Sequence, residues 1–329
     1  MNAGAFKKTA LVGVSLVLIA VSAAAQDTGQ PSPVAASQAF KLTGFTQVLS
    51  TSQSDGLDAL ALRRARFSLI GDVLKNVKIL VQVDLVKSPA LLDAQVDWTL
   101  SKAIDVRVGQ FKIPFSLESN TSYDNLDTIE HSQVVDKVAP GWDIGSNGRD
   151  IGLVLAGQAS IFEYAVGAFN GAGINKADTN DHKDLTGRLL ARPVDGLSIG
   201  GSYYDGLYST AAGAPRTVRR RTGYEAAWVK GILSLKAEYI RATDAATTRA
   251  GGYVQAAVFV VPKKYQVVLK YDAYDNNLSL GGDCVDAYTA GVNWFWAERS
   301  RLQVNYRVFR SEAGLTLNRV LEVQFQIGY

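Results

Sequence analysis

Three arginines lie within a span of four residues, at Arg63, Arg64 and Arg66. A guanidinium stays charged at physiological pH, and its planar fork of N–H donors matches the oxygens of a phosphate group. If the segment is an extended strand, alternate residues share a face. Arg64 and Arg66 then lie opposite Ala65 and Phe67, so the spacing predicts that the two guanidiniums share one polar face of the strand.

His131 and Ser132 are the residues closest to a catalytic pattern. Catalysis needs a base about 3 Å from its nucleophile and oriented by a third group. Adjacent residues in an extended stretch point to opposite faces, which disfavours this pair. With His182 the chain has 2 histidines, too few and too isolated to predict a metal cluster, and we expect no cofactor.

The first 25 residues have the pattern of a secretory signal peptide. Lys7 and Lys8 supply the charged start, residues 11–21 the apolar stretch, and residues 23–25 a run of alanines for cleavage. We therefore expect the mature protein to begin near Gln26, after cleavage near Ala25. Residues 26–39 are expected to be a short flexible segment, and residues 40–329 a single domain.

The composition of the rest of the chain limits its class. No second apolar run approaches the roughly 20 residues of a transmembrane helix. Cys284 is the only cysteine, so no disulfide within the chain supports the fold. The formal charge of +3 does not require a nucleic-acid partner.

Apolar and polar residues alternate from Phe40 onward, which is the period of β-strands. In the stretch 77–85, for example, valine, isoleucine and leucine alternate with Lys78, Gln82 and Asp84. The pattern predicts sixteen strands, near residues 40–49, 60–70, 77–86, 91–99, 104–112, 149–157, 161–170, 184–193, 197–206, 218–229, 232–242, 251–261, 265–274, 285–296, 300–310 and 319–329.

The connections between these strands sort by length. Every second connection is short, as at Lys230-Gly231, whereas the intervening ones are often longer, above all Lys112 to Gly148. Rings stand at the ends that face the short turns: Trp98, Trp228, Trp294, Trp296, Tyr329, Phe40, Phe162 and Tyr265. Short turns, long outer loops and aromatic girdles indicate an antiparallel transmembrane β-barrel in the bacterial outer membrane.

Several motifs resemble the porin O and P family, the phosphate- and pyrophosphate-selective outer-membrane porins. They are Leu62-Arg63-Arg64-Ala65-Arg66-Phe67, the run from Val106 to Glu118, Ile129-Glu130-His131-Ser132, Ala139-Pro140-Gly141, Arg149-Asp150-Ile151-Gly152 and the run from Tyr164 to Gly171. The resemblance implies a sixteen-stranded barrel, usually a homotrimer, with the third outer loop folded into the lumen. Here that loop is Lys112 to Gly148. It also implies that pore-lining arginines guide anions, a role that falls to the Arg63-Arg64 pair.

Two sets of charged residues are candidates for the pore. The basic, anion-guiding candidates are Arg63, Arg64, Arg66, Arg107, Lys112, Arg219 and Arg221, with Arg63 near the outer rim. The acidic candidates of the constriction loop are Glu118, Asp124, Asp127 and Glu130. Because an acidic constriction favours cations, we expect only weak selectivity among small polar solutes, whereas the resemblance implies a preference for anions or phosphate.

Two other segments have simpler interpretations than nucleotide or nucleic-acid binding. The basic run Arg216 to Arg221 falls in a predicted outer loop, which favours lipopolysaccharide contact or steering at the pore mouth. The Arg63 to Arg66 cluster has a similar alternative, in which interfacial arginines hold lipopolysaccharide phosphates. Gly171 to Lys176 lacks the third glycine of a nucleotide loop and is expected to be a flexible outer loop.

The sequence leaves two other functions open. One is an outer-membrane barrel enzyme of the lipase or protease type, using Ser132 with His131 or a loop carboxylate with His182. The other is a structural or adhesive barrel closed by its own loop. A porin is expected to conduct ions and to turn over neither esters nor peptides, which separates the three.

Overall fold

The structure, a computed structural model, describes residues 40–329. The predicted signal peptide and the predicted flexible segment that follows it lie outside the described residues. Among those described, no helix is long and apolar enough to cross a membrane.

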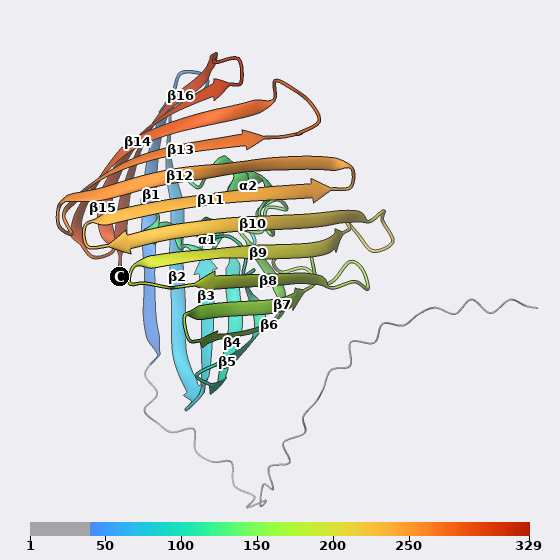
Figure 1. Cartoon of the computed structure of the whole chain (residues 1–329). Helices are drawn as coiled ribbons and strands as arrows, with labels where there is room; N and C mark the ends of the chain where they lie inside the picture. Colours follow the sequence, from blue (N-terminus) through green and yellow to red (C-terminus); the bar gives the residue numbers. More distant parts are fainter. Residues whose placement is uncertain (1–39) are drawn as a thin grey trace, which may run out of the picture. The chain divides into compact units, whose positions relative to one another are not determined.

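Sixteen antiparallel strands form a closed barrel in which every strand pairs with its neighbours in sequence and β1 pairs with β16 (Figure 1). The fold class and the strand count predicted from the sequence are confirmed. The strands are β1 Lys41–Gln53, β2 Ala59–Leu74, β3 Val77–Asp84, β4 Leu91–Ser101, β5 Ile104–Lys112, β6 Arg149–Ala159, β7 Phe162–Phe169, β8 Asp184–Ala191, β9 Leu197–Tyr208, β10 Thr217–Lys230, β11 Leu233–Asp244, β12 Thr247–Val261, β13 Tyr265–Asp275, β14 Cys284–Ala297, β15 Ser300–Ser311 and β16 Thr316–Gly328.

The barrel carries its apolar side chains outside and its polar side chains inside. In β13, Val267 and Leu269 are exposed on the outer face, while Gln266, Lys270 and Asp272 are buried inside. A soluble protein buries its apolar face, so this arrangement is that of a barrel surrounded by lipid. Closure leaves no strand edge with unpaired backbone groups, which lipid could not solvate.

The two ends of the barrel differ in their connections. At one end, the turn end, connections are short, and the chain leaves β16 there. The other end, the loop end, carries the segment between β5 and β6. The predicted loop at Thr243–Ala250 is instead a tight hairpin in which Ala245 has a φ of 50°. β11 continues to Asp244 and β12 begins at Thr247, because Thr243 pairs with Thr248 and Asp244 with Thr247 in a stretch where the sequence shows no alternation.

Aromatic side chains surround the turn end. The rings of Trp98, Trp228, Trp294 and Trp296 are all exposed there, and Trp296 stacks on Phe325 with ring centroids 5.1 Å apart. Amphipathic rings favour the boundary between hydrocarbon and water. Their position therefore marks one membrane interface on the barrel wall.

Residues 113–148, between β5 and β6, contain three short helices: α1 Leu117–Asn120, η1 Tyr123–Asn125 and α2 Gln133–Val138. In Figure 1, α1 and α2 lie within the ring of strands, behind β10 to β12. α2 contacts β11, β12 and β13. We call this segment the third loop.

Candidate functional site: the third loop and the lumen

The third loop has its own apolar anchor on the inner wall. Val134, Val135 and Val138 of α2 are buried in one cluster with Ile240 of β11 and Tyr274 of β13. These wall residues are exceptions to the polar interior. They give the helix an apolar surface to pack on, and this contact orients the rest of the loop.

The start of α1 is held by the wall as well. Ser116 caps the helix, since its hydroxyl accepts a hydrogen bond from the Ser119 amide at 3.0 Å. The amides of Leu117 and Glu118 donate to the Glu238 carboxylate at 3.1 and 3.2 Å. The first amides of a helix have no partner within it, so a wall carboxylate satisfies them here.

Glu118 lies at the centre of a buried polar cluster. Its Oε1 is 2.5 Å from Lys270 Nζ, and its Oε2 accepts hydrogen bonds from the Ser132 amide and hydroxyl at 2.6 and 2.7 Å. Burial alone would raise the pKa of Glu118, but Lys270, with a further contribution from the Ser132 amide, holds it below the usual value. The carboxylate is therefore ionised and fully occupied.

The other three acidic candidates also bind wall residues. Asp127 accepts hydrogen bonds from Lys236 at 2.6 Å, from Gln255 at 2.7 Å and from Gln266 at 3.0 Å. Asp124 pairs with Arg299, and Glu130 pairs with Arg63. The sequence predicted an acidic constriction, yet all four carboxylates are engaged by the wall and none stands free to attract cations.

The arginine cluster of β2 is buried under the same loop. The Arg64 guanidinium carbon lies 3.2 Å from the centroid of the Tyr123 ring, and Arg64 donates to Gln47 at 2.9 Å. Arg66 pairs with Asp84 at 3.0 Å. The predicted inward direction of Arg64 and Arg66 agrees with the structure, but these guanidiniums hold the loop instead of lining an open channel.

Arg63 departs from the predicted alternation. Leu62 pairs with Val48 and Arg64 with Gln47, so Arg63 is the extra residue of a β-bulge. Its side chain therefore turns inward too, where it pairs with Glu130 of the third loop. Strict alternation of the strand residues predicts a position near the outer rim for Arg63. The extra residue of the bulge explains why its side chain points inward instead.

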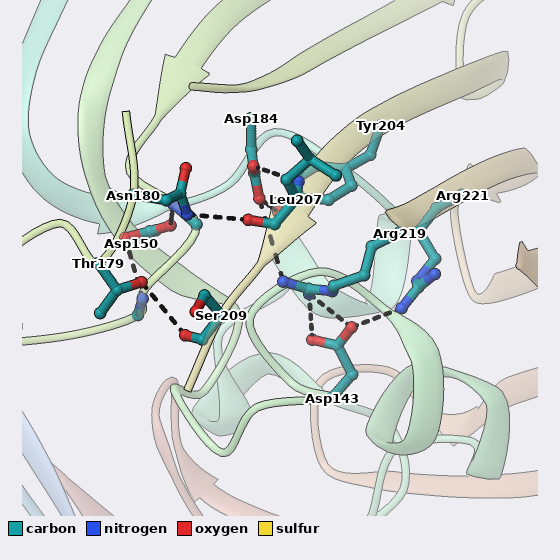
Figure 2. Close-up of polar contacts among 12 residues, drawn as sticks. Asp143, Asp150, Thr179, Asn180, Asp184, Tyr204, Leu207, Ser209, Arg219 and Arg221 are labelled. Carbon is teal, nitrogen blue, oxygen red and sulfur yellow. Dashed lines mark hydrogen bonds and ion pairs between the residues drawn. The ribbon is translucent and has the colours of Figure 1, made fainter. Parts of the chain in front are cut away.

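Arg219 and Arg221 of β10 form a second arginine site on the loop. Figure 2 shows the Asp143 carboxylate between the two guanidiniums, at 2.6 and 2.7 Å from Arg219 and 2.7 Å from Arg221. Arg221 also donates to the Val138 carbonyl at 2.7 Å. Both side chains are almost fully buried, so they too act as anchors.

The glycine-rich segment after β7 packs on the end of the third loop. Asp150 accepts hydrogen bonds from the amides of Gly171 and Gly173 at 2.6 and 3.2 Å. Gly173 has a φ of 86°, and a Cβ there would lie 2.1 Å from the Ser146 hydroxyl. The glycines thus serve close packing between two loops, and no helix follows them that could bind a nucleotide.

An open cavity of about 400 Å³ remains on the opposite side of the lumen, against β3 to β7. Its charged lining residues are Lys78, Asp97, Asp105, Arg107 and Lys112. Arg107 is 44% exposed and lies 2.5 Å from Asp97. Of the seven basic candidates, Arg107 and Lys112 are those that line this cavity.

Lys112 joins the loop to the cavity. Its ammonium donates to the Ser119 and Thr121 carbonyls of the third loop at 2.6 and 2.9 Å. No carboxylate bonds to it among residues 40–329. Backbone carbonyls of the third loop therefore hold this ammonium at the edge of the cavity.

His131 and Ser132 do not form a catalytic pair. His131 is buried between Tyr123 and Trp142, and its Nδ1 lies 3.1 Å from Asp136. Burial lowers the pKa of His131 to about 3, while the Ser132 hydroxyl donates to Glu118. The described part of the chain contains no group of three or more histidine, cysteine or acidic residues that could hold a metal.

Sequence reasoning missed several anchors of the third loop. Arg299 lies in the turn between β14 and β15, where nothing in the strand pattern marks it, and it binds Asp124 at 2.6 Å. Arg149 pairs with Asp93 at 2.8 Å. The motif that contains Arg149 was recognised, but its partner lies on β4 and could only be found from the fold.

Comparison with known proteins agrees with this arrangement. A family model described as phosphate-selective porin O and P matches residues 44–215 and 200–319. A comparison with curated proteins found no match.

The barrel also resembles solved outer-membrane proteins. The channel DcaP of Acinetobacter baumannii has a TM-score of 0.64 at 12% identity, with 89% of this chain and 98% of that chain covered. Salmonella typhi OmpF, in complex with daunomycin, gives 0.64 at 12%, with 88% and 97% covered. A trimer form of OmpT from Vibrio cholerae gives 0.62 at 11%, with 89% and 100% covered.

Proposed function

Because this chain belongs to the family of phosphate-selective porins O and P, an outer-membrane family, we propose that its water-filled lumen passes small polar solutes by passive diffusion along the wall of β3 to β7. The third loop fills the other side of the barrel. The observation that carries the proposal is the cavity of about 400 Å³ beside the third loop, whose lining contains five charged residues. Diffusion through it requires no catalysis, and the chain acts as a channel and not as an enzyme.

The ion selectivity of the channel depends on the charged side chains that remain exposed to water. The carboxylates and guanidiniums under the third loop neutralise one another, so they contribute little field to the passage. Along the cavity, Lys78, Arg107 and Lys112 face Asp97 and Asp105. Since local charges at the narrowest point set ion selectivity, this mixture supports a weak preference for anions, including phosphate.

We assign anion guidance to Arg107 and Lys112, and loop anchoring to Arg63, Arg64, Arg66, Arg219 and Arg221. Arg107 is well exposed at the cavity, whereas Arg64, Arg66, Arg219 and Arg221 are nearly inaccessible to solvent. A solute cannot be guided by a group that it cannot reach. Glu118, Asp124, Asp127 and Glu130 belong to the same anchoring set, because each binds a cation of a barrel strand or, for Asp124, of the turn between β14 and β15.

The protein's assembly and export follow from the same proposal. A signal peptide ending near Ala25 directs export, the long loops face the outside of the cell, and three chains form a homotrimer, as in the trimer form of the Vibrio cholerae protein. Lipids and lipopolysaccharide surround the apolar outer wall. Nucleic acid is not a partner.

Conductance tests the proposed function. Single channels in a planar bilayer should give discrete steps, and reversal potentials in gradients of chloride, phosphate and acetate should indicate a weak preference for anions. Arg107→Ala should lower the anion-to-cation permeability ratio. Arg319→Ala removes an exposed outward arginine instead and should leave the ratio unchanged.

The two alternative functions give different results. A structural or adhesive barrel closed by the third loop would give no steps from correctly folded protein. A barrel enzyme would hydrolyse ester or peptide substrates above background. The form of that enzyme that uses His131 and Ser132 is disfavoured, because the hydrogen bonds of these two side chains lead to different partners.

A further inference from the structure

An apolar recess lies on the outer wall of the barrel across β9 to β13. Its volume is about 770 Å³, within the range of ligand sites in proteins. The floor consists of small residues, among them Ala226, Ala237 and Gly252, and the rim includes Tyr224, Tyr239 and Leu278. We call this recess the outer groove.

The groove is continuous with a second recess that runs toward the turn end. That recess, of about 790 Å³, shares Ala226, Ala237 and Val254 with the outer groove and ends at Trp228. Together the two recesses form one long groove on the outer surface of the wall, which runs from the loop end toward the aromatic girdle. An elongated apolar chain fits this shape. If the groove were empty, the side chains that line it would lose close packing on that side.

One cation lies beside the outer groove, opposite the lining residue Ala250 in the strand register. Arg241 is exposed on the outer face of β11, two residues beyond Tyr239 and about 7 Å farther along the strand. Its register neighbours are Thr222 of β10 and Ala250 of β12. Over residues 40–329, no hydrogen bond or ion pair engages the Arg241 side chain.

A neighbouring arginine is different. Arg220 of β10 is also exposed on the outer face, but it pairs with Asp205 at 2.8 Å. Arg241 thus presents an unneutralised charge at the edge of an apolar surface. A guanidinium in this position is suited to a phosphate whose attached chains enter the groove below.

We propose that the outer groove and Arg241 form a binding site for lipopolysaccharide, with a phosphate on Arg241 and an acyl chain over Ala226, Ala237 and Gly252. The site depends on the proposed function, because the loop end meets the outer leaflet only if the chain is an outer-membrane porin with its long loops outward. The ligand combines the two features that the wall offers: anionic phosphates at the interface and saturated chains beneath. A lipid without an anionic group would fill the groove but would gain nothing from Arg241.

The experiment measures binding of purified lipopolysaccharide to the full mature protein after refolding in lipopolysaccharide-free detergent. Arg241→Gln should weaken binding by on the order of tenfold, as expected for loss of a charge-assisted hydrogen-bonded contact. The matched control, Arg220→Gln, removes an arginine already paired with a carboxylate and should change binding little. Lipopolysaccharide stripped of its phosphates should bind wild type and Arg241→Gln equally.

Ala237→Leu tests the groove itself, because it fills the floor without altering charge. It should weaken binding of intact and dephosphorylated lipopolysaccharide alike. Equal affinity of Arg241→Gln and Arg220→Gln would overturn the proposal. So would an Ala237→Leu variant that alters the oligomeric mass but not the binding, since the groove would then be a contact between copies of the chain.

Conductance of the same samples separates the two proposals. If Arg241→Gln shows normal single-channel steps and binds lipopolysaccharide with the affinity of wild type, the outer-groove site alone is refuted. Absence of steps from folded wild type would refute the porin function. Phosphatidylglycerol, which also has a phosphate and acyl chains, should bind more weakly than lipopolysaccharide, which offers more phosphates and more chains. Equal affinity for the two lipids would assign the site to a general anionic lipid.

Discussion

The guanidinium carbon of Arg64 on β2 lies 3.2 Å from the centre of the Tyr123 ring in the third loop. Arg63 and Arg66 surround the same ring at 5.9 and 5.3 Å. A tyrosine ring thus occupies the arginine cluster that the sequence assigned to solutes. The consequence is that the cluster positions the loop, and the loop in turn determines where the lumen stays open.

The contact between Arg64 and Tyr123 should be worth about 2 kcal/mol, as for a desolvated cation–π pair. Tyr123→Leu and Arg64→Met should each speed amide hydrogen exchange at residues 122–126. The double variant should cost less than the sum of the two single variants, because the second change removes a contact that is already lost. Purely additive effects would show that the two side chains are not coupled.

In the Glu118 and Lys270 pair, a single substitution should destabilise the third loop more than substitution of both residues. Their side chains are 4% and 2% exposed, and removing one member of a buried pair costs about 3–5 kcal/mol. Glu118→Gln should therefore expose the third loop to proteolysis, and Glu118→Gln with Lys270→Gln should restore most of its protection. Arg299→Gln, which breaks a pair with a side chain 36% exposed, should have a smaller effect.

Asp143→Asn should release Arg219 and Arg221 from their shared carboxylate. The change removes one negative charge beside two guanidiniums, although Arg221 keeps its ion pair with Asp244 at 2.7 Å and Arg219 lies 4.0 Å from Asp184. The net positive charge near the lumen then increases, so the anion-to-cation permeability ratio should rise. Reversal potentials in a potassium chloride gradient measure this. Asp178→Asn, which removes a carboxylate paired with Lys183 in the loop between β7 and β8, is the control, and an equal response of both variants would contradict the anchoring role of Asp143.

His131 should make the packing of the third loop depend on pH. Burial lowers its pKa from 6.5 to about 3, so a released loop binds a proton that the packed loop excludes. The stability of the packed loop is fully present above about pH 6.5 and should fall by at most about 1.4 kcal/mol per pH unit as the pH drops toward 3.

Hydrogen exchange of the loop between pH 7 and pH 5 detects this effect once intrinsic exchange rates are corrected. His131→Phe keeps a ring between Tyr123 and Trp142 and should flatten the dependence. Protonation of Glu118 lowers the stability of the packed loop further once the pH falls below the ordinary pKa of this group, 4.5. Wild type and His131→Phe share this second loss. An equal slope in wild type and His131→Phe would exclude the histidine as its source.

Much of the fold could be predicted from the sequence because each strand has to satisfy two solvents at once. Lipid on one face and water or polar groups on the other enforce a period of two, which is legible in β13 and β16 without any tertiary information. The same constraint placed Trp98 and Trp228 at the turn end. The tight hairpin at Ala245 was missed because threonine and alanine fit either side of the barrel.

The candidate site was less predictable because it depends on contacts distant in sequence. The motifs around Arg64 and Glu118 indicated charged residues of the right kind, but not that each charge has a partner. Asp127 meets Lys236 and Gln255 only because the third loop crosses the barrel. The bulge at Arg63 is a local irregularity that hydrophobic alternation cannot reveal.

Thiol modification in the open cavity tests the central claim, that solutes pass along β3 to β7. In a Cys284→Ser background, Thr99→Cys places a thiol on the cavity lining, and Gln303→Cys places one at a buried wall position under the third loop. A charged thiol reagent should lower the single-channel conductance of Thr99→Cys in discrete steps and leave Gln303→Cys unchanged. Block at Gln303→Cys with no effect at Thr99→Cys would contradict the account.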